Sequence, residues 1–274
     1  MTFLPTFDRR IPYVAVDVDA AFVGPVPDIS KRNADAFMEC CGSGQIAFFC
    51  TGRGRKESLR ILYNLCDVLP LYQGYPGVYH SGAIILDKGG NLIHGTYFSN
   101  HTLTRILDTV RYACFERMAI FCSFDKWMVL SDDHRMLERA MDESGLYMPL
   151  FVSTREEILN SDISQILIYQ YRVISRSLAP YDNVCFKIRR DQRAFVQLAP
   201  LGVTPARGIW RLMRHYNIRC DMCSYVGYPC EISDFPTVAM EGRGPSSQQD
   251  GNRRPKNVIR VINPKCVMRP TNSA

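Results

Sequence analysis

The sequence has no apolar run that approaches the roughly 18 residues a transmembrane helix needs. Its first ten residues have no apolar segment after a basic stretch, so they do not look like a secretory signal. We therefore expect a cytoplasmic protein without a membrane partner. No internal repeat is visible, and with 46% hydrophobic and 22% charged residues the composition is that of an ordinary globular protein.

An excess of acidic residues is also missing. The chain has 33 Lys and Arg against 27 Asp and Glu, a net charge of +6 that favours anionic ligands such as phosphate esters. The basic residues are spread along the chain and form no stripe with aromatic residues. We therefore expect no nucleic-acid partner.

The eleven cysteines lack the even count and regular spacing of a disulfide framework. Several lie inside apolar runs, which is typical of buried thiols in a reducing compartment. One cluster could hold structural zinc through four ligands, and its members are His215, Cys220, Cys223 and Cys230. The alternative is that these are core or loop thiols, because Cys223 leads directly into an apolar strand.

The beginning of the chain has the pattern of a parallel sheet. Residues 13–16 and 46–50 are short apolar strands, and residues 31–41 have the apolar spacing of a connecting helix. A strand–helix–strand unit of this length predicts a right-handed crossover. A second amphipathic helix is predicted over residues 58–69.

The pattern changes near residue 84, where two short strands flank the Gly-rich turn 87–91. Mixed strands and helices follow, and the first pattern resumes near residue 193 with a strand at 195–198, a helix at 208–216 and a strand at 223–226. We predict a doubly wound α/β core, residues 1–83 and 193–274, with an inserted α+β domain, residues 84–192. Residues 242–257 are expected to form a polar loop, and 258–262 a last edge strand.

Asp17 and Asp19 follow the apolar run 13–16. Ligands of open α/β sheets bind just past the carboxyl ends of strands, and a tight turn there brings two such carboxylates together. They could hold a hard cation such as Mg²⁺, or one could attack phosphorus while the other donates a proton. The alternative is a helix N-cap beside a surface acid.

Several short motifs follow one another in a fixed order along the chain. They are Asp17-x-Asp19, Cys50-Thr51-Gly52-Arg53, His80-Ser81-Gly82-Ala83, Gly202-Val203-Thr204 with Arg207-Gly208, Gly227, and Val238-Ala239-Met240. In this respect nearly the whole chain resembles the Cof-type branch of the haloacid dehalogenase (HAD) superfamily, Mg²⁺-dependent phosphatases with a mobile cap domain. The Thr-Gly-Arg turn and the Ser-Gly-Ala segment are the most specific parts of the resemblance.

The resemblance implies a role for each matching residue. Asp17 would be the nucleophile that forms an aspartyl-phosphate, and Asp19 the general acid and base. Thr51 and Gly52 would bind the phosphoryl oxygens, with Arg207 as the nearby cation. Thr51 could alternatively be only an N-cap of the helix that follows it. Asp17 and Asp19 would also be the Mg²⁺ ligands.

The chain departs from the family pattern at several positions. Ala20-Ala21 replaces the usual Gly-Thr, Arg207 replaces a Lys, and Tyr228 and Ile232 stand where metal-binding Asp residues are expected. Ser81 and Arg243 replace two Asn residues. Glu231 or Asp234 is a candidate substitute ligand, so the resemblance implies a weakened Mg²⁺ site; Asp234 could instead cap a helix.

Two functions stay open at this point. One is a phosphatase of small phosphorylated metabolites such as sugar phosphates. The other is an inactive relative that binds a phosphorylated ligand or a protein partner, which the losses at Tyr228, Ile232 and Ala20-Ala21 favour.

Overall fold

The computed structural model describes residues 13–23, 27–67, 71–146, 148–172, 174–190, 194–227, 238–241 and 259–262. The chain divides into two compact units. One comprises the described residues up to His94 and from Thr204 onward, and the other runs from Gly95 to Val203. The second unit is therefore inserted into the first.

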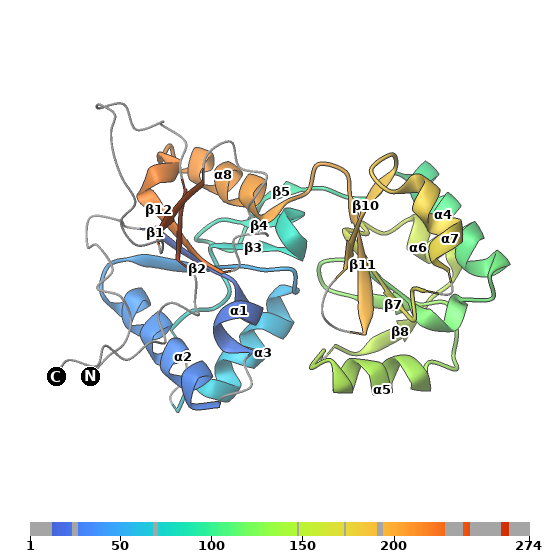
Figure 1. The fold of residues 1–274 in the computed structure, drawn as a ribbon, viewed down its shortest axis with the longest axis horizontal. Helices are drawn as coiled ribbons and strands as arrows, with labels where there is room; N and C mark the ends of the chain where they lie inside the picture. Colours follow the sequence, from blue (N-terminus) through green and yellow to red (C-terminus); the bar gives the residue numbers. More distant parts are fainter. Residues whose placement is uncertain are drawn as a thin grey trace. The chain divides into compact units, whose positions relative to one another are not determined.

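The core unit is built on an eight-stranded sheet (Figure 1). Its order is β13-β14-β12-β1-β2-β3-β4-β5, and the strands from β13 to β3 are parallel to their neighbours. β3 and β4 are antiparallel. The strands are β1 (Tyr13–Val16), β2 (Ile46–Cys50), β3 (Gly77–Tyr79), β4 (Ile84–Leu86), β5 (Leu92–Gly95), β12 (Cys223–Val226), β13 (Val238–Glu241) and β14 (Ile259–Ile262).

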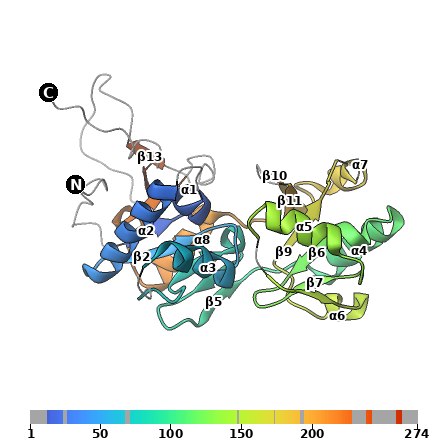
Figure 2. The same cartoon turned by 90° about the horizontal axis from the view of Figure 1, so that it is seen from below.

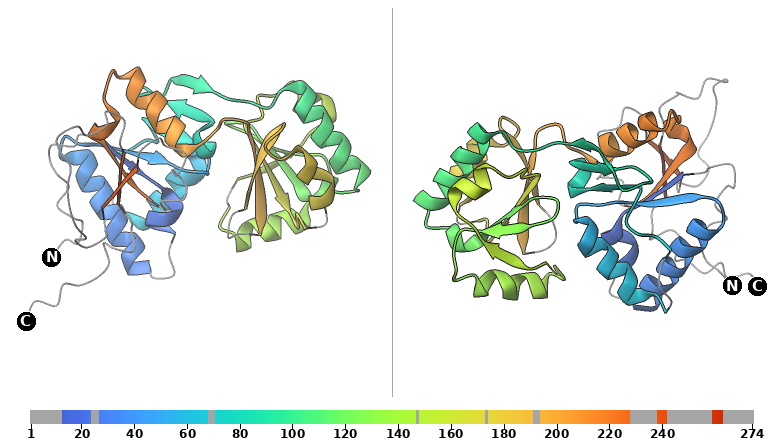
Figure 3. Two further views of the ribbon diagram at one scale, coloured as in Figure 1. Left: turned by 45° about the horizontal axis from the view of Figure 1, so that its top comes forward. Right: turned by 180° about the vertical axis from the view of Figure 1, so that it is seen from behind.

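Helices cover both faces of this sheet, as a doubly wound fold requires. Figures 1 and 3 show α8 on one face, and α1, α2 and α3 on the other. Because β1 is buried along its whole length, its four residues are all apolar. The helical elements are α1 (Val18–Phe22), α2 (Pro27–Gly42), α3 (Arg55–Leu65), η1 (His80–Gly82), α8 (Pro205–His215) and η4 (Cys220–Met222).

The inserted unit contains a six-stranded sheet of order β10-β11-β9-β6-β7-β8, which Figure 2 shows from a second direction. Its neighbours are antiparallel except for β7 and β8, so the unit is of the α+β type. The strands are β6 (Ala119–Cys122), β7 (Trp127–Val129), β8 (Leu150–Val152), β9 (Gln165–Tyr169), β10 (Phe186–Arg190) and β11 (Phe195–Pro200). The helices are α4 (Asn100–Tyr112), η2 (Glu116–Met118), α5 (Arg135–Glu143), α6 (Arg155–Leu159), α7 (Ser175–Leu178) and η3 (Ala179–Tyr181).

Side-chain alternation gives this second sheet two apolar faces. In β6, Ala119 and Phe121 join a cluster with α4, α6 and α7. Ile120 and Cys122 point to the opposite face and join a cluster with α5. The period of two therefore explains why β6 is apolar throughout although it lies in an antiparallel sheet.

The predicted α/β class with an inserted α+β portion is confirmed, but the unit boundaries differ from residues 83/84 and 192/193. The 84–95 hairpin belongs to the core sheet because β4 pairs with β3, Val78 lying opposite Ile85. Conversely, β11 pairs with β9 and β10 in the inserted sheet. A short apolar run does not specify which sheet its backbone will join.

Three predicted elements also differ in position. β14 is not an edge strand, because it lies between β12 and β13. Helix α8 begins at Pro205 rather than at residue 208, since Thr204 accepts the amide N–H of Arg207 and proline is favoured in a first turn. Helix α3 begins at Arg55. Among the residues described, no helix is both long and apolar enough to span a bilayer.

Candidate functional site

Asp17 lies directly past the carboxyl end of β1 and is 2% exposed. Its backbone N–H donates to the Val226 carbonyl at 2.8 Å, which ties the turn to the end of β12. Its carboxylate Oδ2 accepts the Ala20 N–H at 2.9 Å, so Asp17 is also the N-cap of α1. Asp17 is therefore both the N-cap of α1 and a buried carboxylate at the end of β1, so the two interpretations of this residue do not exclude each other.

Ala20 and Ala21 form part of the short helix α1, and Ala21 is buried. A flexible residue is therefore not required after Asp19, because the chain continues in regular helical geometry. The same helix places Asp19 in its first turn, where a carboxylate interacts favourably with the helix dipole.

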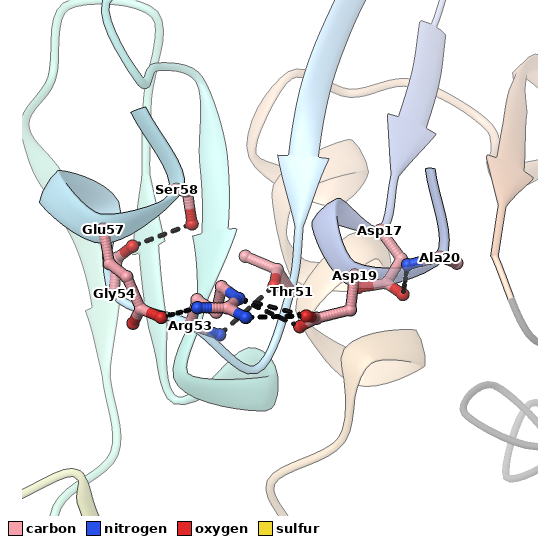
Figure 4. Close-up of polar contacts among 8 residues, drawn as sticks. All are labelled: Asp17, Asp19, Ala20, Thr51, Arg53, Gly54, Glu57 and Ser58. Atoms are coloured by element: carbon pink, nitrogen blue, oxygen red, sulfur yellow. Dashed lines mark hydrogen bonds and ion pairs between the residues drawn. The ribbon is translucent and has the colours of Figure 1, made fainter. Parts of the chain in front are cut away.

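Asp19 is bound by Arg53, which follows β2. The Arg53 Nε lies 3.1 Å and 3.2 Å from the two carboxylate oxygens, and Nη2 lies 2.9 Å from Oδ1. Figure 4 shows this fork reaching Asp19 across the gap between the ends of β1 and β2, with Thr51 beside it. The Asp19 side chain is 29% exposed. Arg53 therefore fixes the orientation of a carboxylate that solvent can still reach.

Glu57 holds the other side of the same guanidinium. Its Oε1 accepts from Nη1 of Arg53, and both residues are buried. One buried cation thus joins a buried carboxylate to a partly exposed one, and each partner offsets the cost of burying the charge. Sequence reasoning missed Glu57, because Arg53 lies in the turn before α3 and Glu57 in its first turn, so their contact is not that of a regular helical pair.

Thr51 and Gly52 form the turn between β2 and α3. Thr51 is 1% exposed, and its hydroxyl accepts the Arg53 N–H at 3.2 Å. The N-cap of α3 is Gly54, so the alternative that Thr51 caps this helix is wrong. The Ser81 N–H donates to the Thr51 carbonyl at 2.9 Å, which joins this turn to η1.

The η1 segment has an unusual backbone. His80, Ser81 and Gly82 have φ angles of 48°, 57° and 102°. Left-handed geometry is costly for a residue with a side chain, and such residues cluster at functional sites. His80 is buried, and burial lowers its pKa from 6.5 to about 4, so the ring is neutral at pH 7.

Helix α8 packs closely against η1 through two glycines. A Cβ on Gly82 would lie 2.2 Å from the Thr204 carbonyl oxygen, and one on Gly208 would lie 2.4 Å from Val78. Only glycine permits this approach. The start of α8, including Arg207, is therefore held beside η1, which in turn contacts the Thr51 turn. The Arg207 side chain is exposed.

Sequence reasoning missed two further basic residues of this unit, Arg211 near Arg207 and His94 near Arg211. Arg211 is one helical turn further along α8, and His94 is in β5. Burial first and Arg207 second lower the pKa of Arg211. Burial first and Arg211 second lower the pKa of His94. No sequence signal indicates this cluster, because it depends on how α8 packs against the β4–β5 hairpin.

The expected fourth motif lies outside the described residues, and so do its substitutes. This applies to Tyr228, Cys230, Glu231, Ile232, Asp234 and Arg243, and to the whole of the 242–257 loop. Within the described part of the chain, no three His, Cys, Asp or Glu side chains gather as a metal site. The structure thus brings Asp17, Asp19 and Thr51 together, while Glu231 and Asp234 stay predictions.

The zinc hypothesis rests on four residues, of which three are described. Burial raises the pKa of the Cys220 thiol to about 11, and it raises the pKa of the Cys223 thiol as well. The His215 ring packs against Tyr216, with centroids 5.0 Å apart. Cys220 and Cys223 are buried whereas His215 is exposed, and Cys230 lies outside the described residues, so the four-ligand zinc site stays a prediction.

Comparison with known proteins gives a consistent result. The family model of haloacid dehalogenase-like hydrolases matches residues 14–227. A sugar phosphatase of HAD subclass IIB superposes with a TM-score of 0.62 at 18% identity, covering 83% of this chain and 86% of its own. A HAD-superfamily phosphatase from Bacteroides thetaiotaomicron gives 0.62 at 16% identity, covering 86% of both chains.

A HAD/COF-like hydrolase candidate from Plasmodium vivax has a TM-score of 0.65 at 20% identity, covering 81% of this chain and 79% of its own. Among curated proteins, a chloroplastic protein of Arabidopsis thaliana named endoribonuclease YBEY is 20% identical over 271 residues. That match covers 95% of this chain and 46% of the relative, so the chain spans about half of its length.

Proposed function

The chain belongs to the haloacid dehalogenase-like hydrolases, and from this premise we propose that it is a phosphatase of small phosphorylated metabolites. The proposal depends on one observation. Asp17 and Thr51 follow the carboxyl ends of the neighbouring strands β1 and β2, and Arg53 orients Asp19 between them. The sugar phosphatase among its structural neighbours supports this substrate class.

In the proposed reaction, a carboxylate oxygen of Asp17 attacks the phosphorus of the monoester. The bond from phosphorus to the ester oxygen breaks, and the departing oxygen takes a proton from Asp19. Water then attacks the phosphorus of the aspartyl-phosphate and gives its proton to Asp19, which releases phosphate and restores Asp17. In both steps the carboxyl group of Asp19 must keep a fixed orientation, and its hydrogen bonds with Arg53 hold it in place.

The phosphoryl group requires donors that offset its charge. Thr51 and Gly52 lie in the turn after β2, where the Thr51 hydroxyl and the Gly52 backbone N–H can serve this purpose. Arg207, in the first turn of α8, is the proposed cation. An Arg offers a planar fork of N–H groups where a Lys would offer a compact charge.

Magnesium is the cofactor that we propose for this site. The described donors fit it in part: Asp17 offers a buried carboxylate, whereas Arg53 already places a cation against Asp19. Asp17 would hold the ion together with Glu231 or Asp234, and Asp19 would contribute only where Arg53 leaves room. When bound, the ion would neutralise phosphoryl charge. This limited donor set predicts weak binding.

The inserted unit, residues 95–203, is proposed as the cap. In this role it would exclude water from the site and select the substrate. Tyr169 at the end of β9 and the exposed Arg172 are candidates for such contacts, whereas Tyr171 is buried in the core of the unit.

A second function is favoured by the same ion pair. Because Arg53 contacts both oxygens of Asp19, the chain could instead be an inactive relative that binds a phosphorylated ligand or a protein partner. The absence of Asp at 228 and 232 favours this alternative as well.

Hydrolysis of an aryl phosphate and of a panel of sugar phosphates tests the proposal, with Mg²⁺ and with chelator. We expect Mg²⁺-dependent phosphate release that Asp17→Asn lowers about 10³-fold or more. Asn is itself a good N-cap, so the fold should survive. The matched control is Asp35→Asn, an exposed carboxylate of α2 whose removal should leave the rate unchanged. Equal rates for parent and Asp17→Asn would support the inactive alternative.

A further inference from the structure

Arg207 and Arg211 present two guanidinium groups from one side of α8. They are four residues apart, so their Cβ atoms lie about 5–6 Å from each other. The influence of Arg207 on the pKa of Arg211 shows that the two charges are close enough to repel. An anion between or beside them would relieve this repulsion.

His94 brings a third basic group to Arg211 from a different element. Its pKa is lowered first by burial and then by the charge of Arg211. The three side chains come from two elements that pack in the same unit, α8 and β5. The cluster is therefore built by the tertiary fold rather than by a run of basic residues.

Arg211 has an incomplete hydrogen-bonding shell. Its Nη1 atom is buried and, within the described ranges, has no hydrogen-bond partner. No ion pair of Arg211 with a described carboxylate is formed. A buried guanidinium N–H without an acceptor is costly, so this donor is suited to a ligand that brings its own acceptor.

The location of the cluster relates it to the proposed phosphoryl site. Thr204 precedes α8 and lies against Gly82, and Ser81 contacts Thr51. Arg207 therefore stands nearest this turn, and Arg211 lies one helical turn beyond it. A ligand group at Arg211 would be separate from the phosphoryl group yet belong to the same small molecule.

We propose that Arg211 and His94 bind a second anionic group of the substrate, a phosphate or a carboxylate. This inference rests on the proposed function and deepens it. The preferred substrates are then phosphate monoesters that also bear a second anion, such as sugar bisphosphates. The guanidinium fork matches either group with two parallel N–H···O bonds.

The test compares ligands that differ only in the second anion. Binding of a hexose 1,6-bisphosphate and of a hexose 6-phosphate is measured by calorimetry on the full chain, in the Asp17→Asn background so that neither ligand is consumed. We expect the bisphosphate to bind about 10–100-fold more tightly. Arg211→Gln should remove this preference and leave the affinity for the monophosphate nearly unchanged.

Two further variants separate the role of Arg211 from that of charge in general. Arg214→Gln removes the same charge from the same helix, at a side chain that stacks on Trp210, and should retain the preference. Arg211→Lys keeps the charge without the fork and should retain part of it. An equal preference in Arg211→Gln, or no preference in the parent background, would overturn the inference.

The outcome can be distinguished from that of the proposed function. Phosphatase activity without an Arg211-dependent preference for the bisphosphate would contradict the second-anion site and leave the proposed function intact. An Arg211-dependent preference in a chain that releases no phosphate would contradict the phosphatase function. It would still support the second-anion site, as part of a ligand-binding protein.

Discussion

Arg53 is a buried residue and Arg211 a partly buried one of the same unit, and their guanidinium groups have different surroundings. Arg53 lies between Asp19 and Glu57, and its fork is satisfied on two sides. Arg211 lies near Arg207 and His94, and its Nη1 meets no acceptor in the part of the chain that the structure describes.

The difference indicates two uses of a guanidinium group. A guanidinium that is surrounded by carboxylates holds the protein together and orients its partners. One that lies beside a second guanidinium, with a buried donor that meets no acceptor in the described residues, is left with donor capacity that a ligand can match. Arg53 thus belongs to the framework that holds the site together, and we assign Arg211 to the binding of a ligand.

The largest expected effect comes from breaking the Arg53 network. Arg53→Met should lower the free energy of unfolding by about 3–5 kcal/mol, because it leaves Glu57 buried without its cation. Urea denaturation measures this loss. The double variant with Glu57→Met should lose less than the sum of the two single changes, and simple additivity would contradict the buried pairing.

His80 adds a buried basic group to the comparison of Arg53 with Arg211, and unlike an arginine it is neutral at pH 7 and gains its proton only at low pH. Its folded pKa of about 4 lies below the usual 6.5, so the unfolded chain binds the proton first as pH falls. The His80 contribution to stability is therefore complete above pH 6.5 and is lost progressively toward pH 4, by about 3 kcal/mol.

The measurement is the free energy of unfolding at a series of pH values for the parent and for His80→Asn. Asn tolerates the left-handed backbone at this position, and it does not titrate. The difference between the two curves should narrow below pH 6.5. Parallel curves from pH 7 to pH 4 would show that burial does not control the charge of this ring.

The smallest expected effect is that of Arg211→Met. No hydrogen bond of Nη1 is lost, and repulsion with Arg207 is relieved. The free energy of unfolding should change by less than about 0.5 kcal/mol, or increase. A loss comparable to that of Arg53→Met would mean that Arg211 is a framework residue too.

Local pattern was enough to predict the parallel core and the two carboxylates. The apolar runs 13–16 and 46–50 and the connecting helix have the periods that their buried positions impose. Asp17 and Asp19 could be placed at a strand end for the same reason. The order of strands could not be predicted, because the position of β14 between β12 and β13 depends on long-range pairing.

The partners of the site residues were harder to predict than the residues themselves. Arg53 was visible in a motif, but its contact with Asp19 joins turns after two different strands. Glu57 precedes the predicted helix 58–69 and belongs to none of the motifs, and its burial is a property of the folded chain. His94 and Arg211 meet only after the hairpin has joined the core sheet.

The hydrogen bond from the Asp17 N–H to the Val226 carbonyl also affects the order of events during synthesis. β1 pairs with β12, which follows it by more than 200 residues in the sequence. β1 therefore cannot form this pair until β12 has left the ribosome. The inserted unit, Gly95–Val203, is continuous in sequence and can fold as soon as it emerges. The nascent chain therefore completes its second unit first, and the turn that holds Asp17 is among the last parts to assemble.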